Sequence, residues 1–384
     1  MTRLPIAIRQ RLAPCLMALV AALLPGVGWA TRAAVSAVAA PTAASAATPA
    51  ATPAATPAGS ARPVTLRIVG GLASINQYTR HEEPFWTRTL PRLTGGALQA
   101  EIVPFDRAGI RGQDMLRLLQ LGAVPFGTAL VSLSATQLPL LGAMDLPGLN
   151  PDMASLRRSV DALRPVLQGQ LRQQLGIELL AVYAYPAQVL FCDKPFGTLD
   201  ELRGRRVRVS SAPMADLMVA LGATPVLASF AEVMPKMRAN TIDCAITGTM
   251  TGNTIGLHQL ASHLHPLAIT WGVSVFAANG AAWAALPDDL RQLLKRQLVQ
   301  LEQAIWDEAD RETGAGIACN RGDARCPAAQ RGHMTVLPVT PADQARLRQL
   351  LAEVVLPRWL ERCGPGCAKT WNATLAPVAG LRAP

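Results

Sequence analysis

The regular alternation of short apolar strands with amphipathic helices constrains this chain most, and it extends from residue 63 to the C-terminal end. Apolar residues that alternate or form a short run predict a strand, and a repeat every three or four residues predicts a helix. This alternation is typical of α/β layers, in which helices cover a sheet. The predicted strands are 64–69, 98–103, 128–131, 177–183, 188–192, 207–210, 243–247 and 271–278. The predicted helices are 82–93, 113–121, 153–175, 199–202, 214–221, 230–238, 287–312 and 341–362.

The length of 384 residues is enough for two or three domains. Half of the residues are hydrophobic and 16% are charged, which excludes a wholly disordered chain. The helix predicted at 287–312 would reach about 40 Å at 1.5 Å per residue, long enough to cross two lobes. We therefore expect an α/β protein with two lobes and a long helix that spans them.

The first 62 residues predict export rather than a folded domain. Residues 1–30 combine a basic start, an apolar run and a small-residue cleavage site, as in a secretory signal peptide. The apolar run is too short to span a membrane, and Cys15 lacks the setting of a lipid-attachment cysteine. Residues 31–62 consist mainly of Ala, Thr, Ser and Pro and predict a disordered linker. We expect a soluble periplasmic protein.

The net charge and the cysteine spacing disfavour a nucleic-acid-binding protein and a zinc protein. Removal of the leader with its three arginines lowers the net charge from +10 to +7, and the basic residues are scattered, which disfavours nucleic-acid binding. Cysteine spacing does not fit a zinc site. Local bridges Cys319–Cys326 and Cys363–Cys367 are plausible, with Cys192 and Cys244 left over, but the sequence does not fix the pairing.

Motifs for catalysis are mostly missing. No phosphate-binding loop, no G-x-S-x-G elbow and no H-E-x-x-H pair is present. His263 and His265 could share one face of a strand, yet core or solvated histidines are the simpler interpretation. We predict no metal site and no cofactor.

Arg208 is the strongest candidate for a functional side chain. It lies near the end of the strand predicted at 207–210, just before a helix that Ser210 or Ser211 would cap. A planar guanidinium binds a carboxylate in bidentate fashion better than lysine can, and a helix N-terminus favours the same anion. The pattern predicts carboxylate capture.

The segment around Arg208 resembles a known family. It reads Leu202-x-Gly204-x-x-Val207-Arg208-Val209, then Leu-Gly-Ala-Thr-Pro at 221–225, then Glu232-Val233 and Ile242-Asp243. These ordered motifs are similar to those of the solute receptors of tripartite ATP-independent periplasmic (TRAP) transporters, of the dicarboxylate-receptor type. The resemblance also covers Thr-Gly-Gly at 94–96 and Trp-Ala-Ala-Leu-Pro at 283–287.

The resemblance implies roles for individual residues. Arg208 matches the arginine that clamps the ligand carboxylate, and Thr247 falls where members often place a pocket-lining asparagine or aromatic residue. Gln188 stands where many members carry a second arginine, which weakens the case for a dicarboxylate and leaves a monocarboxylate or a more neutral solute open. Asn76 and Tyr78 follow the first strand-end glycines, where an α/β cleft opens, and Thr249 is a further candidate for ligand contact.

The resemblance also implies the architecture and the partners. We expect lobe I at 63–186, completed by about 274–313, and lobe II at 187–273, completed by about 314–384. Closure of the lobes on a small organic acid would present the receptor, expected to be a monomer, to the membrane subunits of a transporter.

Alternatives remain at this stage. Arg208 could be a structural arginine paired with Glu232 or Asp243, and Gln188, Thr247 and Thr249 could simply satisfy backbone groups. A solute sensor that is not coupled to transport would share all of the binding chemistry. An exported enzyme on the same scaffold would need a nucleophile and a base, which the motifs do not supply. The binding protein of an ATP-driven transporter is a closer variant.

Overall fold

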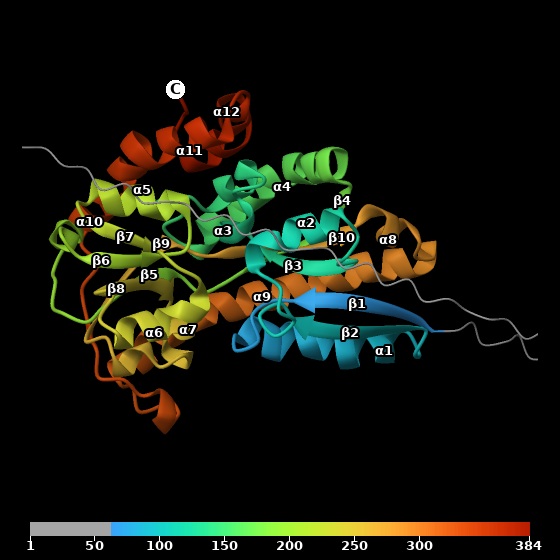
Figure 1. Cartoon of the computed structure of the whole chain (residues 1–384), viewed down its shortest axis with the longest axis horizontal. Coiled ribbons are helices and arrows are strands. Elements are labelled where there is room, and N and C mark those ends of the chain that lie inside the picture. Colours follow the sequence, from blue (N-terminus) through green and yellow to red (C-terminus); the bar gives the residue numbers. More distant parts are fainter. Residues whose placement is uncertain (1–62) are drawn as a thin grey trace, which may run out of the picture. The chain divides into compact units, whose positions relative to one another are not determined.

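The computed structural model describes residues 63–384, so the predicted leader and linker at 1–62 lie outside the described residues. The described strands form two mixed sheets (Figure 1). The first sheet has the order β2-β1-β3-β10-β4, with β1 (Val64–Gly70), β2 (Leu98–Pro104), β3 (Phe126–Leu130), β4 (Ile177–Ala184) and β10 (Val273–Asn279). The second has the order β11-β9-β5-β8-β6-β7, with β5 (Gln188–Cys192), β6 (Arg206–Val209), β7 (Thr224–Leu227), β8 (Cys244–Gly248), β9 (His263–Thr270) and β11 (Thr335–Val336).

Each sheet mixes parallel and antiparallel pairs. In the first sheet β1 is parallel to β2 and β3, while β10 is antiparallel to β3 and β4. In the second sheet β5 is antiparallel to β8 and β9, and β6 is parallel to β7 and β8. The chain therefore leaves the first sheet after β4, builds most of the second sheet, and returns to the first as β10.

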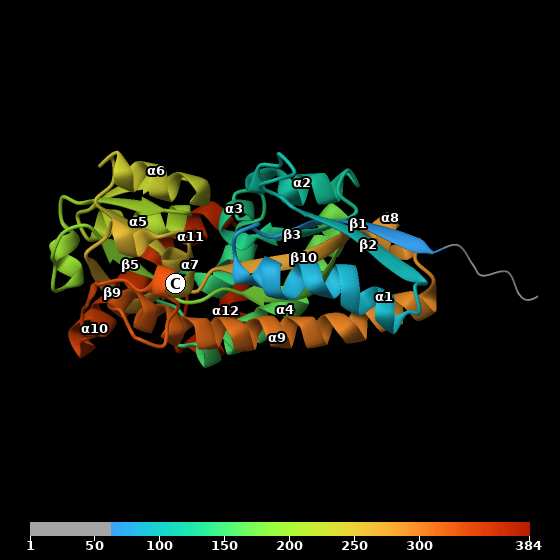
Figure 2. The same cartoon turned by 90° about the horizontal axis from the view of Figure 1, so that it is seen from below.

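Helices cover both sheets (Figures 1 and 2). They are α1 (Leu90–Leu93), α2 (Met115–Gln120), α3 (Val131–Ser134), α4 (Met153–Leu175), α5 (Ala212–Ala220), α6 (Val233–Arg238), α7 (Thr249–Thr254), α8 (Gly280–Ala284), α9 (Asp288–Arg321), α10 (Pro341–Leu350), α11 (Leu356–Cys363) and α12 (Cys367–Ala379). Shorter or irregular helical segments are η1 (Gln77–Glu82), η2 (Phe85–Thr89), η3 (Gly112–Asp114), η4 (Pro139–Asp145), η5 (Leu199–Leu202), η6 (Phe230–Glu232), η7 (Leu257–Gln259), η8 (Ala328–Gln330) and η9 (Leu351–Val355). None of the helices between residues 63 and 384 is both long enough and apolar enough to cross a bilayer.

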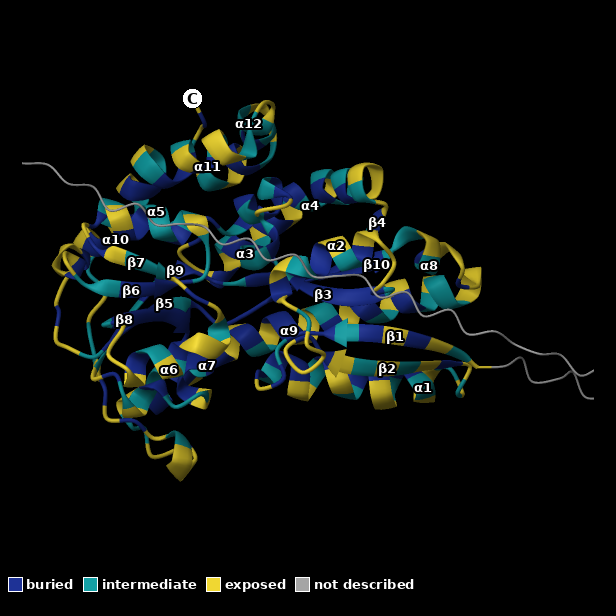
Figure 3. Ribbon diagram, viewed as in Figure 1, coloured by how far each residue is buried: buried dark blue, intermediate teal, exposed yellow. Residues whose placement is uncertain are grey.

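Burial follows the layers, with the strands mostly buried and the outer helix faces exposed (Figure 3). A compact apolar cluster on one face of the first sheet joins Trp86, Phe276 and residues of α9. A larger cluster fills the other face of that sheet and continues through the second sheet to α12.

The long helix α9 connects the two sheets. Its N-terminal half buries Leu294 and Leu298 in the cluster of the first sheet, and its C-terminal half packs on α7 beside the second (Figure 2). The sequence predicted its end at residue 312, but the helix continues to Arg321. Gly314 and Gly316 resemble helix breakers, yet a Cβ on Gly316 would lie 2.3 Å from the backbone nitrogen of Met250. Glycine is needed there for close packing rather than for a turn.

Other boundaries also differ from the prediction. Strands β4 and β10 are close to the predicted positions, and α4 and β5 have the predicted bounds. No strand was predicted at the positions of β7, β9 and β11, and the last helix was predicted to end near residue 362, before α12. Proline explains two of these omissions, because Pro225 in β7 and Pro266 in β9 argue against a strand from sequence alone.

Three disulfide bonds link cysteines within residues 63–384. Cys319–Cys326 and Cys363–Cys367 close short loops, as the spacing suggested. Cys192 and Cys244, which were left over, face each other across β5 and β8 and are also bridged. Only the strand pairing reveals this third bridge, because the two residues are 52 apart in sequence.

Candidate functional site

Arg208 is a buried cation without an acidic partner. Its side chain is 4% exposed; Nε donates to the carbonyl of Ala228 and Nη1 to the carbonyl of Ile246, both at 3.0 Å. Within residues 63–384, Nη2 makes no hydrogen bond. Desolvation lowers the pKa of Arg208 to about 10, because burial penalises the charged form. Two carbonyls thus fix the guanidinium plane and leave one donor edge available.

The two acids that could have paired with Arg208 are engaged elsewhere. Asp243 accepts from Arg206, with Nη2 to Oδ1 at 2.6 Å, and this pair lowers the pKa of Asp243. Glu232 closes a capping box with Ser229, and its charge raises the pKa of Arg208 by less than burial lowers it. The structural ion pair considered from the sequence is absent at Arg208 in the described part of the chain.

Thr247 lies on β8, the strand beside that of Arg208, and Gln188 lies on β5, one strand farther along the sheet. Gln188 opens β5 and faces Gly248 across the β5–β8 pair. Its Nε2 donates to the carbonyls of Pro186 and Trp271, at 2.9 and 3.3 Å. Thr247 is 2% exposed and directly follows Ile246, whose carbonyl holds Arg208. The adjacent strands β5, β8 and β6 therefore bring these three predicted residues to one region of the second sheet.

Thr249 and Asn76 both donate hydrogen bonds to Glu312, a residue that the sequence analysis did not single out. Thr249 Oγ1 donates to the main-chain carbonyl of Glu312 at 3.1 Å, and Asn76 Nδ2 donates to the Oε1 atom of Glu312. Glu312 lies on α9 and is 7% exposed, and burial raises its pKa. Asn76 follows β1 of the first sheet, whereas Thr249 follows β8 of the second. Glu312 therefore joins segments from both sheets.

The helical spacing of α9 offered a signal for Glu312. Ile305, Ala309, Glu312 and Gly316 recur every three or four residues and are all buried. An acid on the apolar stripe of a helix indicates a specific buried contact. The sequence did not reveal which partners it would meet.

Tyr78 packs against the first sheet. It is 4% exposed, and its ring lies against Gly70 so closely that a Cβ there would be 2.6 Å from Tyr78 Cε2. Burial, and then the charge of Glu83, raise the pKa of Tyr78 to about 12. Tyr78 thus keeps its phenol neutral beside the end of β1. No contact links it to Arg208 within the described residues.

Glu82 is a further buried acid that the sequence analysis did not single out. Its two carboxylate oxygens accept from the backbone N–H of Gly71 at 3.1 Å, from Gln77 Nε2 at 2.8 Å and from Thr128 Oγ1 at 2.9 Å. No cation pairs with it in the described part of the chain, and desolvation raises its pKa. Three donors thus occupy both oxygens of this carboxyl group.

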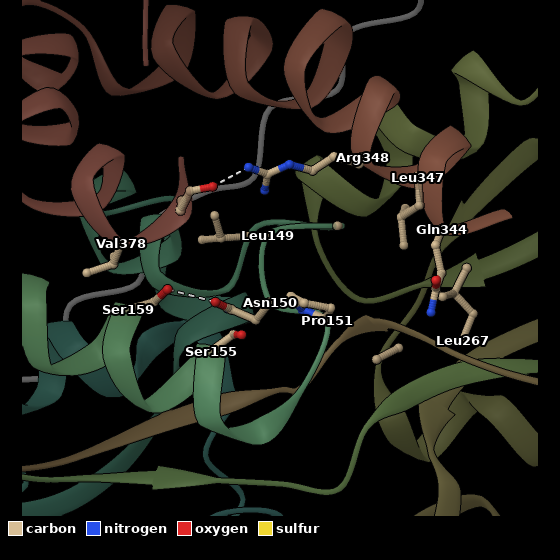
Figure 4. A pocket seen from close by; sticks show the side chains of 13 residues that line it. Leu149, Asn150, Pro151, Ser155, Ser159, Leu267, Gln344, Leu347, Arg348 and Val378 are labelled. Atoms are coloured by element: carbon tan, nitrogen blue, oxygen red, sulfur yellow. Dashed lines mark hydrogen bonds between the residues drawn. The ribbon is translucent and has the colours of Figure 1, made fainter. Parts of the chain in front are cut away.

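A cavity of about 390 Å³ opens elsewhere, between α4, β9, α10 and α12 (Figure 4). None of the six predicted site residues lines it. Its polar groups are largely paired with one another, since Ser159 donates to Asn150 and Arg348 to the carbonyl of Ala379. This cavity holds no unpaired buried charge comparable to Arg208.

Known proteins resemble this chain in sequence. A family model described as bacterial extracellular solute-binding protein, family 7, matches residues 76–358. The C4-dicarboxylate-binding periplasmic protein DctP of Rhodobacter capsulatus is 24% identical over 217 residues, which cover 54% of this chain and 63% of that protein. The chain thus matches less than two thirds of the length of that relative.

Solved structures share the fold. A Bordetella pertussis extracytoplasmic solute receptor that binds pyroglutamic acid has a TM-score of 0.71 at 23% identity, covering 81% of this chain and 99% of that one. A TRAP periplasmic solute-binding protein from Shewanella oneidensis with bound succinate has a TM-score of 0.68 at 19% identity, covering 82% and 99%. The two-lobed α/β fold expected from the sequence is confirmed. The family match extends over most of the chain, which therefore belongs to the bacterial extracellular solute-binding protein family 7, the receptors that the motif around Arg208 resembles.

Proposed function

We propose that this protein is an extracytoplasmic receptor that binds a small organic acid between its two lobes and delivers it to a TRAP-type membrane transporter. The observation that carries the proposal is the state of Arg208, a buried guanidinium with no acidic partner and one donor edge without a hydrogen bond. An uncompensated buried cation is costly, and an incoming carboxylate would offset that cost through charge-assisted hydrogen bonds.

The surroundings of Arg208 suit an anion. The carbonyls of Ala228 and Ile246 hold the guanidinium in one orientation, so little side-chain entropy would be lost on binding. Helix α5 begins shortly after β6, and Ser211 caps it by accepting from the Met214 N–H. The partial positive charge of this helix end favours the same carboxylate.

The other five predicted residues would contact the rest of the solute. In this proposal Gln188 and Thr247 flank Arg208 from the second lobe, while Asn76 and Tyr78 approach from the first. Thr249 and Asn76 have a further task, since both already hold Glu312. We expect them to shape the site as much as to touch the ligand.

Closure of two lobes would trap the ligand, because a solute held by both sides favours only the closed state. The expected boundaries are lobe I at 63–186 with 274–313, and lobe II at 187–273 with 314–384. The membership of β1 to β4 and β10 in one sheet supports this division. The backbone at Trp271 and Gly272, where the chain returns to the first sheet, donates to the carboxylate of Asp145. This contact is a candidate hinge support.

The proposal includes export through the signal peptide at 1–30, a periplasmic location and a monomeric receptor. It requires no cofactor, no metal and no catalysis. The family description, bacterial extracellular solute-binding protein, supports solute binding and a location outside the cytoplasm.

The test is ligand-dependent thermal stability of the mature protein against a panel of mono- and dicarboxylates, beside Arg208→Ala. A ligand at a hundredfold its Kd should add about 2.7 kcal/mol and raise the melting temperature by several degrees. The variant should fold and lose this response. An absence of any shift in the wild type, or an equal shift in the variant, would contradict the proposal.

Delivery to a transporter needs a separate measurement. Cells that lack this protein should take up the identified acid more slowly, and the wild-type gene should restore uptake. Normal uptake without the protein would favour a sensor that is not coupled to transport.

A further inference from the structure

The peptide group between Ala228 and Ser229 is hydrogen-bonded at both of its polar ends. Its carbonyl oxygen, which belongs to Ala228, accepts from Arg208 Nε at 3.0 Å. Its N–H, which belongs to Ser229, donates to Glu232 Oε2 at 2.8 Å. One peptide group therefore lies between the guanidinium of Arg208 and the carboxylate of Glu232, although these two side chains form no ion pair in the described part of the chain.

The geometry of a peptide makes this arrangement directional. A trans peptide is planar, and its N–H and C=O point to opposite sides of the chain. An acceptor that holds the Ser229 N–H therefore also sets the direction of the Ala228 carbonyl. The N–H of Ala228 belongs to the preceding peptide and donates to the carbonyl of Val209 at 3.2 Å. That bond ties the chain to the end of β6 but does not fix the rotation of the next peptide, so Glu232 supplies the missing constraint.

Local contacts hold the Glu232 carboxylate in place. Oε2 also accepts from Ser229 Oγ at 2.7 Å, and the two residues form a reciprocal capping box at the start of η6. Lys236 Nζ lies 3.5 Å from Oε1, one helical turn further on. The side chain of Glu232 is 50% exposed, so these contacts rather than burial fix its position.

The same link acts on the charge of Arg208. Hydrogen bonds in a row polarise one another, so a carboxylate at the N–H end makes the carbonyl at the other end a better acceptor. The negative charge of Glu232 also raises the pKa of Arg208, against the larger effect of burial. Nη2 of Arg208 stays without a hydrogen bond within residues 63–384. Glu232 thus helps to keep the guanidinium charged and oriented without occupying its available donor edge.

We propose that Glu232 is a positioning residue for ligand binding, which aims the Ala228 carbonyl at Arg208 and so holds the guanidinium in the orientation that receives the carboxylate of the solute. This inference rests on the proposed function and adds a residue to its site. The sequence suggested Glu232 only as a direct ion-pair partner of Arg208. If the capping box merely stabilised the helix that follows, α6, its loss would lower stability and leave ligand affinity unchanged.

The first experiment changes Glu232 and measures affinity by calorimetry on the mature protein. The probe is the acid that binds the wild type most tightly in a panel of mono- and dicarboxylates that includes acetate, pyroglutamate and succinate. Glu232→Ala removes the acceptor and should weaken binding about 5-fold or more. Glu232→Gln keeps one oxygen for the Ser229 N–H and should stay within about twofold of the wild type.

Asp152→Ala is the matched control. Asp152 caps α4 by accepting from the Ser155 N–H at 2.7 Å, so its loss also removes a helix cap, but one that has no contact with Arg208. Both alanine variants should lower the melting temperature by about 2 °C. Only Glu232→Ala should also weaken binding of the probe.

Two changes at Ser229 test the peptide itself. Ser229→Ala loses the hydroxyl but keeps the N–H that donates to Glu232, so affinity should stay within about twofold of the wild type. Ser229→Pro has no N–H, and the φ of −62° at Ser229 suits proline. The Ala228 carbonyl then loses its orienting bond, and binding should weaken about 5-fold or more, as in Glu232→Ala.

The outcomes separate this inference from the proposed function. If Glu232→Ala or Ser229→Pro binds the probe within about twofold of the wild type while Arg208→Ala abolishes binding, the inference fails and the receptor function stands. Equal losses in Glu232→Ala and Glu232→Gln would also overturn it, because charge rather than an oriented peptide would then be responsible. If no acid binds the wild type, the proposed function itself fails, and the inference with it. A Ser229→Pro variant that does not fold leaves the two Glu232 variants to decide.

Discussion

Arg208 in the second sheet and Glu82 beside the first are both buried ionisable groups held by neutral partners, but they differ in how many of their hydrogen-bonding atoms have partners. Both oxygens of Glu82 accept hydrogen bonds, from three donors in total. Arg208 donates through Nε and Nη1 to two carbonyls, and Nη2 stays without a partner within residues 63–384. The comparison teaches that burial alone does not identify a binding group. Unused hydrogen-bonding capacity is what distinguishes Arg208 from Glu82.

The largest expected effect is on stability at Glu82. Glu82→Ala leaves the Gly71 N–H, Gln77 and Thr128 without their acceptor, so it should lower the free energy of unfolding by about 3 kcal/mol or more. Glu82→Gln keeps one acceptor oxygen and should cost about half as much. Urea unfolding of both variants measures this. A loss below about 1 kcal/mol in Glu82→Ala would show that the carboxyl group is not structural.

Arg208 should show the opposite pattern. Arg208→Met removes the cation, so ligand affinity should fall about 100-fold, because the carboxylate loses its charged partner. Stability should change less than in Glu82→Ala, since folding no longer desolvates a charge, although the carbonyls of Ala228 and Ile246 lose a donor. Calorimetry and urea unfolding of the same sample test both statements. A large loss of stability with intact affinity would reverse the roles of the two residues.

The sequence predicted much of the fold because local signals mark its elements. Helix α4 has the predicted bounds since Asp152 caps its start and Gly176 ends it in a left-handed conformation. Where packing overrides local preference the sequence was misleading, as at Gly316 in α9 and Pro266 in β9. These glycine and proline residues are read as breakers unless the neighbouring element is known.

The candidate site was only partly predictable for the same reason. Arg208 follows from a strand end and a helix start that are adjacent in sequence. Glu312 does not, because its contacts with Asn76 and Thr249 join residues 236 and 63 positions away. Such contacts depend on how the two sheets are connected, which no local pattern contains.

Asp145 is a further acid with little exposure to solvent, and pH tests its role. It accepts from the N–H of Trp271 at 2.9 Å and of Gly272 at 2.8 Å, yet desolvation outweighs these bonds and raises its pKa from 3.8 to about 7. The folded protein therefore holds a proton that the unfolded chain releases. Its contribution to stability is full below about pH 4 and is lost as the pH rises to about 7.

Asp145→Asn should flatten this dependence, because the amide does not titrate and still accepts one N–H. Between pH 4 and 7 the wild type should lose about 3 kcal/mol more of unfolding free energy than the variant. Glu82 and Glu312 have raised pKa values with the same sign, so the difference between the two proteins isolates Asp145. Equal slopes in urea unfolding across this range would show that the carboxyl group stays ionised.

The smallest effect is expected at Arg206, two residues before Arg208 on the same strand. Arg206 pairs with Asp243 at the surface, where its side chain is 42% exposed, and the backbone N–H of Arg206 holds the same carboxylate at 2.7 Å. Arg206→Ala should lower the melting temperature only slightly, since exposed pairs contribute little and the backbone bond remains. Ligand affinity should stay within about twofold of the wild type. A loss of affinity comparable to that of Arg208→Met would mean that the ligand responds to the basic charge of β6 as a whole, rather than to the one guanidinium that burial and two carbonyls hold in place.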